Sequence, residues 1–457
     1  MIPVPHIYGE SFYVFGLGKS GLSAAVALKR SGAKITAWDD KAENRAKGTE
    51  LGIEMESPEA VNWKEKSALV LSPGIPHTFP IPHPVAQMAK DHKVPIFCDV
   101  EFLFQAQKMS PIIGITGTNG KSTTTALIAH ILKTAHQKAQ EGGNLGIPAL
   151  DLAPLDGVGT YVIELSSYQL ELTKTPALDV AIFLNISKNH LERHGGLEGY
   201  VAAKEKIFHL VKPKGFKIIG VDSPLMQKVY TENKSAHTIP ISGFQEVKNG
   251  VYCYKGVLMD GSREIMDVTS LPTLRGTHNY QNIAAAYAAV TRLTDLDPTV
   301  ICQGIRTYPG LAHRQELVGH VKNILFVNDS KATTLEAALK SIDQYENIFW
   351  IVGGQAKEGW EDVSALLPSL SRIQKVFLIG EAAKGYEKVL SPHLPCIQSG
   401  TLEKAVELAT KEAEKFPGNS VVLLAPACAS WDQFTSFEHR GNTFKSLVQK
   451  LLTSGVA

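Results

Sequence analysis

The chain has 457 residues, which at roughly 150 residues per domain suggests about three domains and excludes a single small binding module. Its 46 basic residues minus 45 acidic residues leave a net charge of +1, so no global positive field would collect nucleic acid or an anionic membrane. With 44% hydrophobic and 20% charged residues, the composition is that of a folded chain and not of a disordered one.

The cysteines and the first residues indicate a cellular compartment. The five cysteines are scattered and none forms a Cys-x-x-Cys pair, so neither a disulfide framework nor a structural zinc site is supported. The opening segment MIPVPHIYGE lacks a basic stretch followed by an apolar one, and no run approaches the roughly 18 apolar residues that cross a bilayer. We therefore expect a bacterial cytoplasmic protein that binds no nucleic acid and does not insert in a membrane.

Short apolar segments alternate with longer helical patterns over most of the chain. Segments such as FYVFGLG, PIIGITG, TYVIELS, IFWIVGG and VVLLAPA have the composition of buried strands. Their alternation with helices predicts an α/β fold with parallel sheets, in which ligands collect at the carboxyl ends of strands. Breaks at Ser110–Pro111 and Pro309–Gly310 suggest units of residues 1–110, 111–310 and 311–457, with a small β-rich insertion at residues 240–275.

The first unit opens with a glycine-rich turn. The segment GLGKSG, residues 16–21, follows a strand-like run and leads into an apolar helical pattern. Together with Asp39 at the end of the next strand, it satisfies the dinucleotide fingerprint, in which a helix N-terminus faces phosphate and an acid meets a ribose hydroxyl. The pattern predicts binding of a nucleotide or nucleotide sugar. The alternative is a tight turn with no ligand.

The middle unit opens with the segment TGTNGKSTT, residues 116–124, between a strand pattern and a helix pattern. Its backbone amides can cradle phosphates, Lys121 can neutralise the β and γ oxygens, and the Ser122 hydroxyl can bind Mg²⁺. The usual P-loop spacing has glycine where this chain has Ile115, and the glycines stand instead at Gly114 and Gly117. The context of strand, Gly-Lys-Ser and helix nevertheless favours phosphate binding over a chance match.

Three further residues of the middle unit could complete a metal site. Glu164 ends one strand pattern and is a usual type of magnesium ligand, whereas His190, after another strand, is a less usual one. Helical spacing puts Lys204 on the apolar face between Val201 and Ile207. Burial of that amine would favour its neutral form. The alternative is a packed stem with an ammonium that reaches solvent.

Several ordered motifs resemble the Mur ligase family across essentially the whole chain. They are GITGTNGKSTT, ELSSYQLE, LNISKNHLERHG, YVAAKEKIF, GTHNYQN, AHRQE, NDSKAT and PACASWDQFTSFEHRGNTF, with GLGKSG and LSPGIP in the first unit. The resemblance implies a Rossmann-like first domain, a central ATPase domain of the P-loop type and a Rossmann-like third domain. It also implies an ATP- and Mg²⁺-dependent ligase that adds D-glutamate to UDP-N-acetylmuramoyl-L-alanine through an acyl phosphate, in peptidoglycan precursor synthesis.

The same resemblance assigns residues to each ligand. Lys204 would be carbamylated by CO₂ and would share a second Mg²⁺ with His190, while Ser122 and Glu164 would hold the Mg²⁺ bound to ATP. The implied ATP-binding residues are Gly117, Thr118, Asn119, Gly120, Lys121, Ser122, Thr123, Asn282, Arg314 and Asp329. Those for the uridine substrate are Gly18, Lys19, Ser20, Asp39, Gly74 and Asn144. Those for D-glutamate, whose two carboxylates need cations and hydroxyl or amide donors, are Lys331, Thr333, Lys357, Ser430 and Phe437.

Some positions and some readings stay open. The family commonly has aspartate where this chain has Asn189, which puts any supporting role of that position in doubt. Phe437 taken alone would be a core aromatic residue, and Arg440 is expected to tether its motif. A nicotinamide-dependent oxidoreductase, a non-enzymatic ATP sensor and a Mur ligase for another amino acid are the rival functions. We expect a monomer. We also expect its third domain to close for catalysis about hinges near residues 110 and 310.

Overall fold

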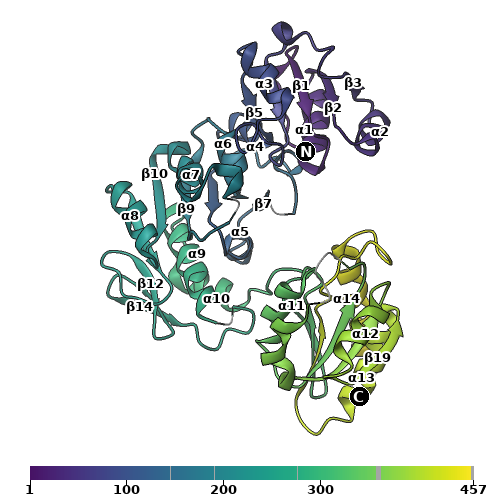
Figure 1. Ribbon diagram of the computed structural model, residues 1–457. Helices are drawn as coiled ribbons and strands as arrows, with labels where there is room; N and C mark the ends of the chain where they lie inside the picture. The colour runs from purple at the N-terminus through teal and green to yellow at the C-terminus, as the bar shows by residue number, and fades with distance from the viewer. Residues whose placement is uncertain (145, 190, 275, 357–361, 454–457) are drawn as a thin grey trace. The chain divides into compact units, whose positions relative to one another are not determined.

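The computed structural model describes residues 1–144, 146–189, 191–274, 276–356 and 362–453 (Figure 1). The chain forms two compact units, Met1–Tyr308 and Pro309–Ala457. The first unit holds two sheets and the second holds one. All five cysteines are free thiols. Within the described ranges, no helix combines the length and the apolar character that a bilayer crossing requires.

The first sheet has five parallel strands in the order β3-β2-β1-β4-β5. Its strands are β1 (Ser11–Phe15), β2 (Lys34–Trp38), β3 (Glu54–Met55), β4 (Ala68–Leu71) and β5 (Ile96–Phe97). The helices that accompany them are α1 (Lys19–Arg30), α2 (Ala42–Glu50), α3 (Pro84–Asp91) and α4 (Asp99–Ala106). The chain reverses its direction of travel across the sheet at β1, which has β2 on one side and β4 on the other. Such a switch point is where open α/β sheets bind ligands.

The second sheet has nine strands in the order β14-β13-β12-β11-β10-β9-β6-β8-β7, parallel from β12 to β7. Its main strands are β6 (Ile112–Thr116), β7 (Ala139–Gly143), β8 (Thr160–Glu164), β9 (Leu178–Phe183), β10 (Val211–Gly220) and β11 (Thr238–Ser242). An antiparallel meander follows: β12 (Val251–Tyr254), β13 (Val257–Asp260) and β14 (Arg263–Asp267). The β-rich segment expected at residues 240–275 is therefore present, and it extends the edge of the main sheet.

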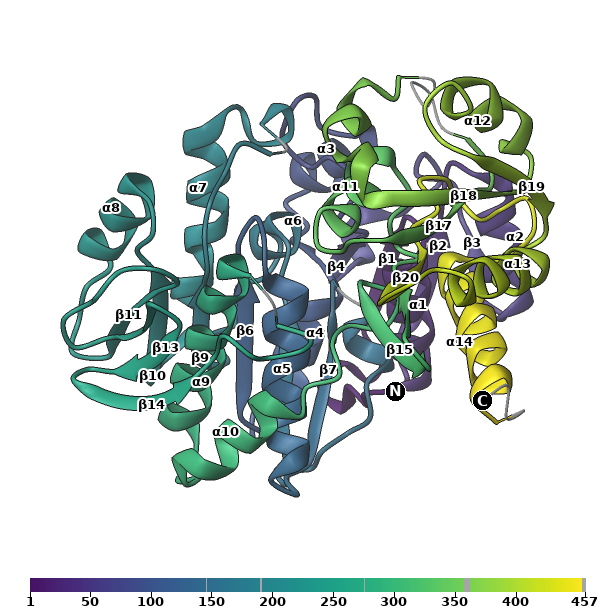
Figure 2. The same ribbon diagram turned by 90° about the horizontal axis from the view of Figure 1, so that it is seen from below.

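Successive side chains of a strand point to opposite faces of the sheet, and in the second sheet both sets are apolar. Helices therefore cover both of its faces. The helices are α5 (Lys121–Thr134), α6 (Ser167–Glu171), α7 (Leu197–Glu205), α8 (Pro224–Glu232), α9 (Tyr280–Leu293) and α10 (Pro298–Arg306). Along β6, Ile113 and Ile115 belong to the hydrophobic cluster with α5, α9 and α10, whereas Ile112 belongs to the cluster on the other face. Figure 2 shows α5 beside β6 and α9 beside β9.

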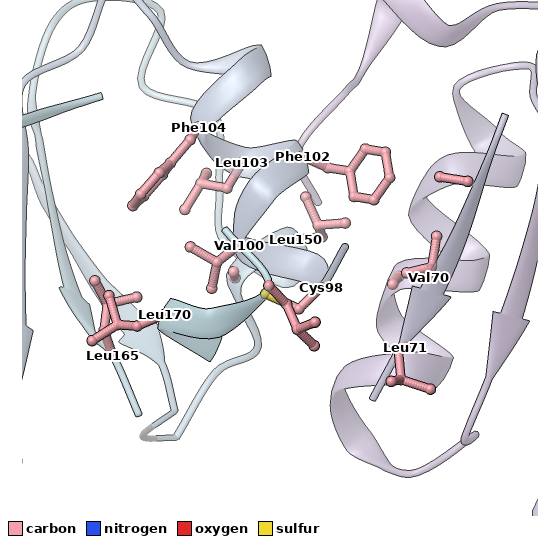
Figure 3. Packing of buried hydrophobic residues seen from close by; sticks show 14 of the residues in the cluster. Val70, Leu71, Cys98, Val100, Phe102, Leu103, Phe104, Leu150, Leu165 and Leu170 are labelled. Carbon is pink, nitrogen blue, oxygen red and sulfur yellow. The ribbon is translucent and has the colours of Figure 1, made fainter. Parts of the chain in front are cut away.

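The first and second sheets share one hydrophobic cluster, which explains why they form one compact unit. Figure 3 shows α4 between them: Phe102 points toward the strand that carries Val70, and Phe104 points to the opposite side. The Phe102 ring makes an edge contact with Phe12 at a centroid distance of 5.5 Å. Leu165, which follows β8, belongs to the same cluster. The fold therefore fixes the first sheet against the second through buried apolar side chains.

The second unit is a six-stranded sheet in the order β15-β16-β20-β17-β18-β19, parallel except for β15. Its strands are β15 (Glu316–Val321), β16 (Ile324–Asn328), β17 (Ile348–Gly353), β18 (Ile373–Ile379), β19 (Cys396–Gly400) and β20 (Ser420–Leu424). Its helices are α11 (Leu335–Ile342), α12 (Ala383–Leu390), α13 (Leu402–Glu414) and α14 (Phe437–Thr453). Adjacent residues of β17 serve opposite faces, with Trp350 in one core cluster and Ile351 in the other. The predicted α/β architecture with parallel sheets is confirmed.

Candidate active site

The loop between β6 and α5 has the geometry of a phosphate cradle. Gly120 caps α5 with a left-handed backbone (φ 80°), and a Cβ there would lie 2.1 Å from the Asn282 side-chain oxygen. The N-terminal amides of α5 follow directly, where anions are stabilised by unpaired N–H groups and the helix dipole. The Lys121 ammonium folds back over the loop and donates to the carbonyls of Gly117 and Thr118, each at 2.9 Å. A cation thus lies where phosphate oxygens would enter.

The predicted magnesium residues Ser122 and Glu164 lie in direct contact. The Ser122 hydroxyl donates to Oε2 of Glu164 at 2.7 Å, and the Asn144 amide donates to Oε1 at 2.7 Å. Among the described residues, no cluster of three His, Cys, Asp or Glu side chains could hold a metal by itself. A hydroxyl and one buried carboxylate suit Mg²⁺ that takes its other ligands from nucleotide phosphates and water. His190, assigned to the second ion, lies outside the described residues.

Lys204 is buried on the inner face of α7, with a relative exposure of 2%. Its amine donates to the Thr116 hydroxyl at 3.2 Å and lies 4.8 Å from the centroid of the Tyr200 ring. Burial, helped by the charge of the nearby Lys121 and partly opposed by Glu164, lowers the pKa of Lys204 from 10.5 to about 7. A substantial fraction of the amine is therefore neutral near pH 7, which is not so for an exposed lysine. The alternative of an ammonium that reaches solvent is wrong.

Three side-chain amides, those of Asn185, Gln281 and Asn282, form hydrogen bonds around the phosphate loop and the first turn of α5. Asn185, just after β9, accepts from the backbone N–H of Asn119 at 2.9 Å and donates to Gln281 at 2.8 Å. The Asn282 oxygen accepts from the Thr124 hydroxyl at 3.3 Å. Asn282 was predicted as an ATP residue, but Asn185 and Gln281 were missed. The sequence signal for Asn185 was its position at the end of a buried strand, which is also where Glu164 stands.

A cavity of about 550 Å³ lies at the switch point of the first sheet. All six residues predicted for the uridine substrate line it: Gly18, Lys19, Ser20, Asp39, Gly74 and Asn144. The Asp39 carboxylate accepts from the backbone N–H groups of Leu17 at 2.6 Å and Lys41 at 2.8 Å, so it also shapes the glycine turn. Ser166, Tyr168 and Gln169, from the start of α6, line the same cavity and were not predicted.

Six of the residues predicted for the second unit lie in its described part, five of them on loops and the sixth, Phe437, at the start of α14. The Lys331 ammonium is 5.9 Å from the centroid of the Phe437 ring, and Ser430 is buried. The backbone N–H of Thr333 donates to the Lys331 carbonyl at 2.9 Å. The Asp329 carboxylate accepts from the Gln315 backbone N–H at 3.3 Å and from the Ser341 hydroxyl. Gln315 directly follows the predicted Arg314 in the sequence. Burial raises the pKa of Asp329. Lys357 lies outside the described residues.

Arg440 holds three of these loop segments together from the inside of the second unit. Its guanidinium is 1% exposed and donates to the Ser330 hydroxyl and carbonyl and to the carbonyls of Cys428 and Ala429, at 2.9–3.3 Å. The Ser330 hydroxyl in turn donates to the Phe437 carbonyl at 2.8 Å. The prediction that Arg440 tethers its motif is confirmed.

The comparisons with known proteins agree with this arrangement. Residues 115–290 match the model of the Mur ligase middle domain. The UDP-N-acetylmuramoylalanine--D-glutamate ligase of Paramagnetospirillum magneticum is 47% identical over all of both chains. The protein of the same name from Rhodospirillum rubrum is 45% identical over 99% of this chain and 97% of its own length.

Solved structures support the fold. The UDP-N-acetylmuramate-alanine ligase MurC of Thermotoga maritima has a TM-score of 0.57 at 18% identity and covers 97% of this chain and 99% of its own. MurF of Acinetobacter baumannii has a TM-score of 0.55 at 19% identity over 77% and 79% of the two chains. The chain belongs to the Mur ligase family, in its branch of UDP-N-acetylmuramoylalanine--D-glutamate ligases.

Proposed function

We propose that this protein catalyses the ATP-dependent addition of D-glutamate to UDP-N-acetylmuramoyl-L-alanine, with ADP and phosphate as the other products. The observation that carries the proposal is the full-length identity of 47% to a ligase of that name. The contact between Ser122 and Glu164 at the phosphate loop supports chemistry on a Mg²⁺-bound nucleotide phosphate. The free cysteines and the use of ATP suit a reducing cytoplasm.

A carboxylate does not form an amide with an amine at neutral pH unless its oxygen becomes a better leaving group. In the proposed first step, an oxygen of the substrate carboxylate attacks the γ-phosphorus of ATP, the bond to the β,γ-bridging oxygen breaks, and ADP leaves. The product is an acyl phosphate. Phosphoryl transfer depends mainly on positioning and on neutralisation of phosphate charge. Lys121 and the amides of residues 117–123 would supply both.

In the second step, the neutral amine of D-glutamate attacks the acyl carbon and forms a tetrahedral intermediate. The C–O bond to phosphate then breaks, and the nitrogen loses a proton. Mg²⁺ held by Ser122 and Glu164 would neutralise phosphate charge. The buried amine of Lys204, with its pKa lowered to about 7, suits reaction with CO₂, in which an N–C bond forms and a proton is released. The carbamate, together with His190, would offer oxygen and nitrogen donors to a second Mg²⁺.

The remaining assignments concern the three substrates, and we propose that a monomer binds them all. The cavity of the first sheet would take the uridine nucleotide, with its phosphates at the N-terminus of α1. Asn282, Arg314 and Asp329 would serve ATP. Lys331, Thr333, Lys357, Ser430 and Phe437 would serve the two carboxylates and the stem of D-glutamate.

The deciding experiment measures phosphate release with ATP, Mg²⁺ and UDP-N-acetylmuramoyl-L-alanine, while the amino acid is varied. D-Glutamate should sustain release, whereas L-glutamate, L-alanine and L-lysine should not. Release that ignores D-glutamate would overturn the proposal. ATP binding without any product would favour the ATP-sensor alternative, and an absorbance titration that detects tight NADH binding would revive the oxidoreductase.

A further inference from the structure

One arginine, Arg193, contacts two segments that line the cavity of the first sheet. It lies in the short 3₁₀ helix η4 (Glu192–His194), in the connection between β9 and β10 of the second sheet. Its guanidinium donates to the backbone carbonyls of Ile75 at 2.8 Å and Phe79 at 3.0 Å. The same group lies 4.9 Å from the centroid of the Tyr168 ring. Ile75 and Tyr168 both line the cavity.

The two carbonyls belong to a connection that we call the strap, residues 72–83 between β4 and α3. Ser72 fixes the start of the strap, because its hydroxyl donates to the Gly16 carbonyl at 2.7 Å. His83 contacts Asp40 at the other end, at 3.2 Å. The middle of the strap projects to the turn after η4, where a Cβ at Gly195 would lie 3.1 Å from the Phe79 ring. Arg193 therefore joins a connection that has no strand or helix to Tyr168 of α6.

The chemistry of the bridge favours a positioning role. A planar guanidinium can donate to two carbonyls at once and lie over an aromatic face, which an ammonium cannot do together. The neighbouring His194 is buried, and its ring stacks on Tyr168 and lies tilted against Tyr200, each at a centroid distance of 5.3 Å. The Tyr200 hydroxyl lies 3.4 Å from Thr118 of the phosphate loop. The wall that Arg193 touches is thus continuous with the phosphate loop.

We propose that Arg193 is a positioning residue that sets the width of the uridine-substrate cavity by clamping the strap against Tyr168. The inference rests on the proposed function, because it takes the occupant of the cavity to be the nucleotide of UDP-N-acetylmuramoyl-L-alanine. Loss of the clamp lets the strap separate from Tyr168, so the substrate must order the strap when it binds. Affinity for this substrate falls, whereas the ATP cradle keeps its own supports.

The test compares Arg193→Ala and Arg193→Lys with Arg292→Ala, whose arginine makes an ion pair with Asp260 in the same unit. For Arg193→Ala we expect KM for UDP-N-acetylmuramoyl-L-alanine to rise about 10- to 30-fold, as the loss of charge-assisted hydrogen bonds predicts. The kcat and the KM for ATP should change less than about threefold. Arg193→Lys should be intermediate, and Arg292→Ala should match the parent.

Calorimetry separates this inference from the proposed function. If the parent protein fails to bind UDP-N-acetylmuramoyl-L-alanine, the proposed function fails. If the parent binds it and a folded Arg193→Ala variant binds it equally well, the clamp is refuted. A uniform rise in KM for all substrates would also refute it, since that is the signature of general destabilisation. In a double-mutant cycle with Tyr168→Leu, the two losses of affinity should be less than additive.

Discussion

The Ser122 hydroxyl, at the start of α5, donates a 2.7 Å hydrogen bond to the Glu164 carboxylate, at the end of β8. The strands that lead to them, β6 and β8, are parallel neighbours in the sheet. Parallel pairing brings both carboxyl ends to the same edge, so two residues separated by 42 positions meet beside the phosphate loop. A hydroxyl and a carboxylate oxygen in this position could supply two of the six ligands of the proposed magnesium ion.

Glu164→Gln should remove that site with little change of shape. The amide would present a donor to Ser122 or Asn144, which are donors themselves, and would no longer carry the charge that attracts Mg²⁺. Phosphate release should fall about 10- to 100-fold, with a higher Mg²⁺ requirement. Steady-state assays over a magnesium series check this, with Glu141→Gln as the control because Glu141 pairs with Lys133 at the surface. An unchanged magnesium dependence would contradict the assignment.

Lys204→Ala should be nearly inactive, with a loss of at least about 100-fold. If the parent acts through a carbamate, added acetate or formate should restore part of the activity by supplying the lost carboxylate. A ¹³C spectrum of the parent with labelled bicarbonate should contain a carbamate signal that the variant lacks. Lys206→Ala, two residues along and exposed, should behave like the parent. Absence of both the signal and the rescue would leave Lys204 as an amine and contradict carbamylation.

Gly120→Ala should weaken ATP binding by about tenfold or more, because a Cβ would strike the Asn282 oxygen and push the loop out of shape. The left-handed backbone alone costs an alanine about 1–2 kcal/mol. Gly261→Ala pays the same backbone cost, at φ +59° with open space around the Cβ, and is the matched control. Titration with a non-hydrolysable ATP analogue compares them. Equal affinities would mean that close contact with Asn282 does not shape the cradle.

Asp99→Asn should stabilise the first unit above pH 6. Asp99 is buried at the N-terminus of α4, and burial raises its pKa to about 6 from 3.8, although the Ala149 amide and Gln169 oppose this. As pH rises from about 4 to about 6, the unfolded chain loses the proton before the folded one does, so folding stability falls. The gain in the variant should be larger at about pH 8 than at about pH 5, by roughly 1 kcal/mol. Urea unfolding measures it, and exposed Asp91→Asn should give no such trend.

Arg440→Met should destabilise the second unit by about 3 kcal/mol or more, because four buried acceptors lose their donor. Arg372→Met removes a surface guanidinium that pairs with Glu346 and should cost less than about 1 kcal/mol. Chemical unfolding followed by circular dichroism compares the two variants. If both lost the same stability, the buried guanidinium would not be what holds the three segments.

Local sequence signals predicted the elements that carry chemistry but not every contact around them. The phosphate loop follows from the Gly-Lys-Ser segment between a strand and a helix pattern, although its glycine spacing is unusual. The strand-end Glu164 and the inward Lys204 follow from strand ends and helical periodicity. The β-rich segment was identified, but its continuity with the main sheet depends on pairing between β11 and β12, which no local pattern encodes. Tyr168, Asn185 and Gln281 were missed because their roles arise only when distant strand ends converge.

By itself, the sequence determined the fold class, the phosphate loop and the family resemblance, because these depend on periodicity and on ordered motifs along the chain. Only the tertiary structure decided that the Lys204 amine is buried beside Thr116, that Ser122 contacts Glu164, and that Arg193 joins the strap to Tyr168. The physical reason is that burial, pKa and hydrogen-bond partners are set by what the folded chain brings near a side chain. Separation along the sequence carries little of that information.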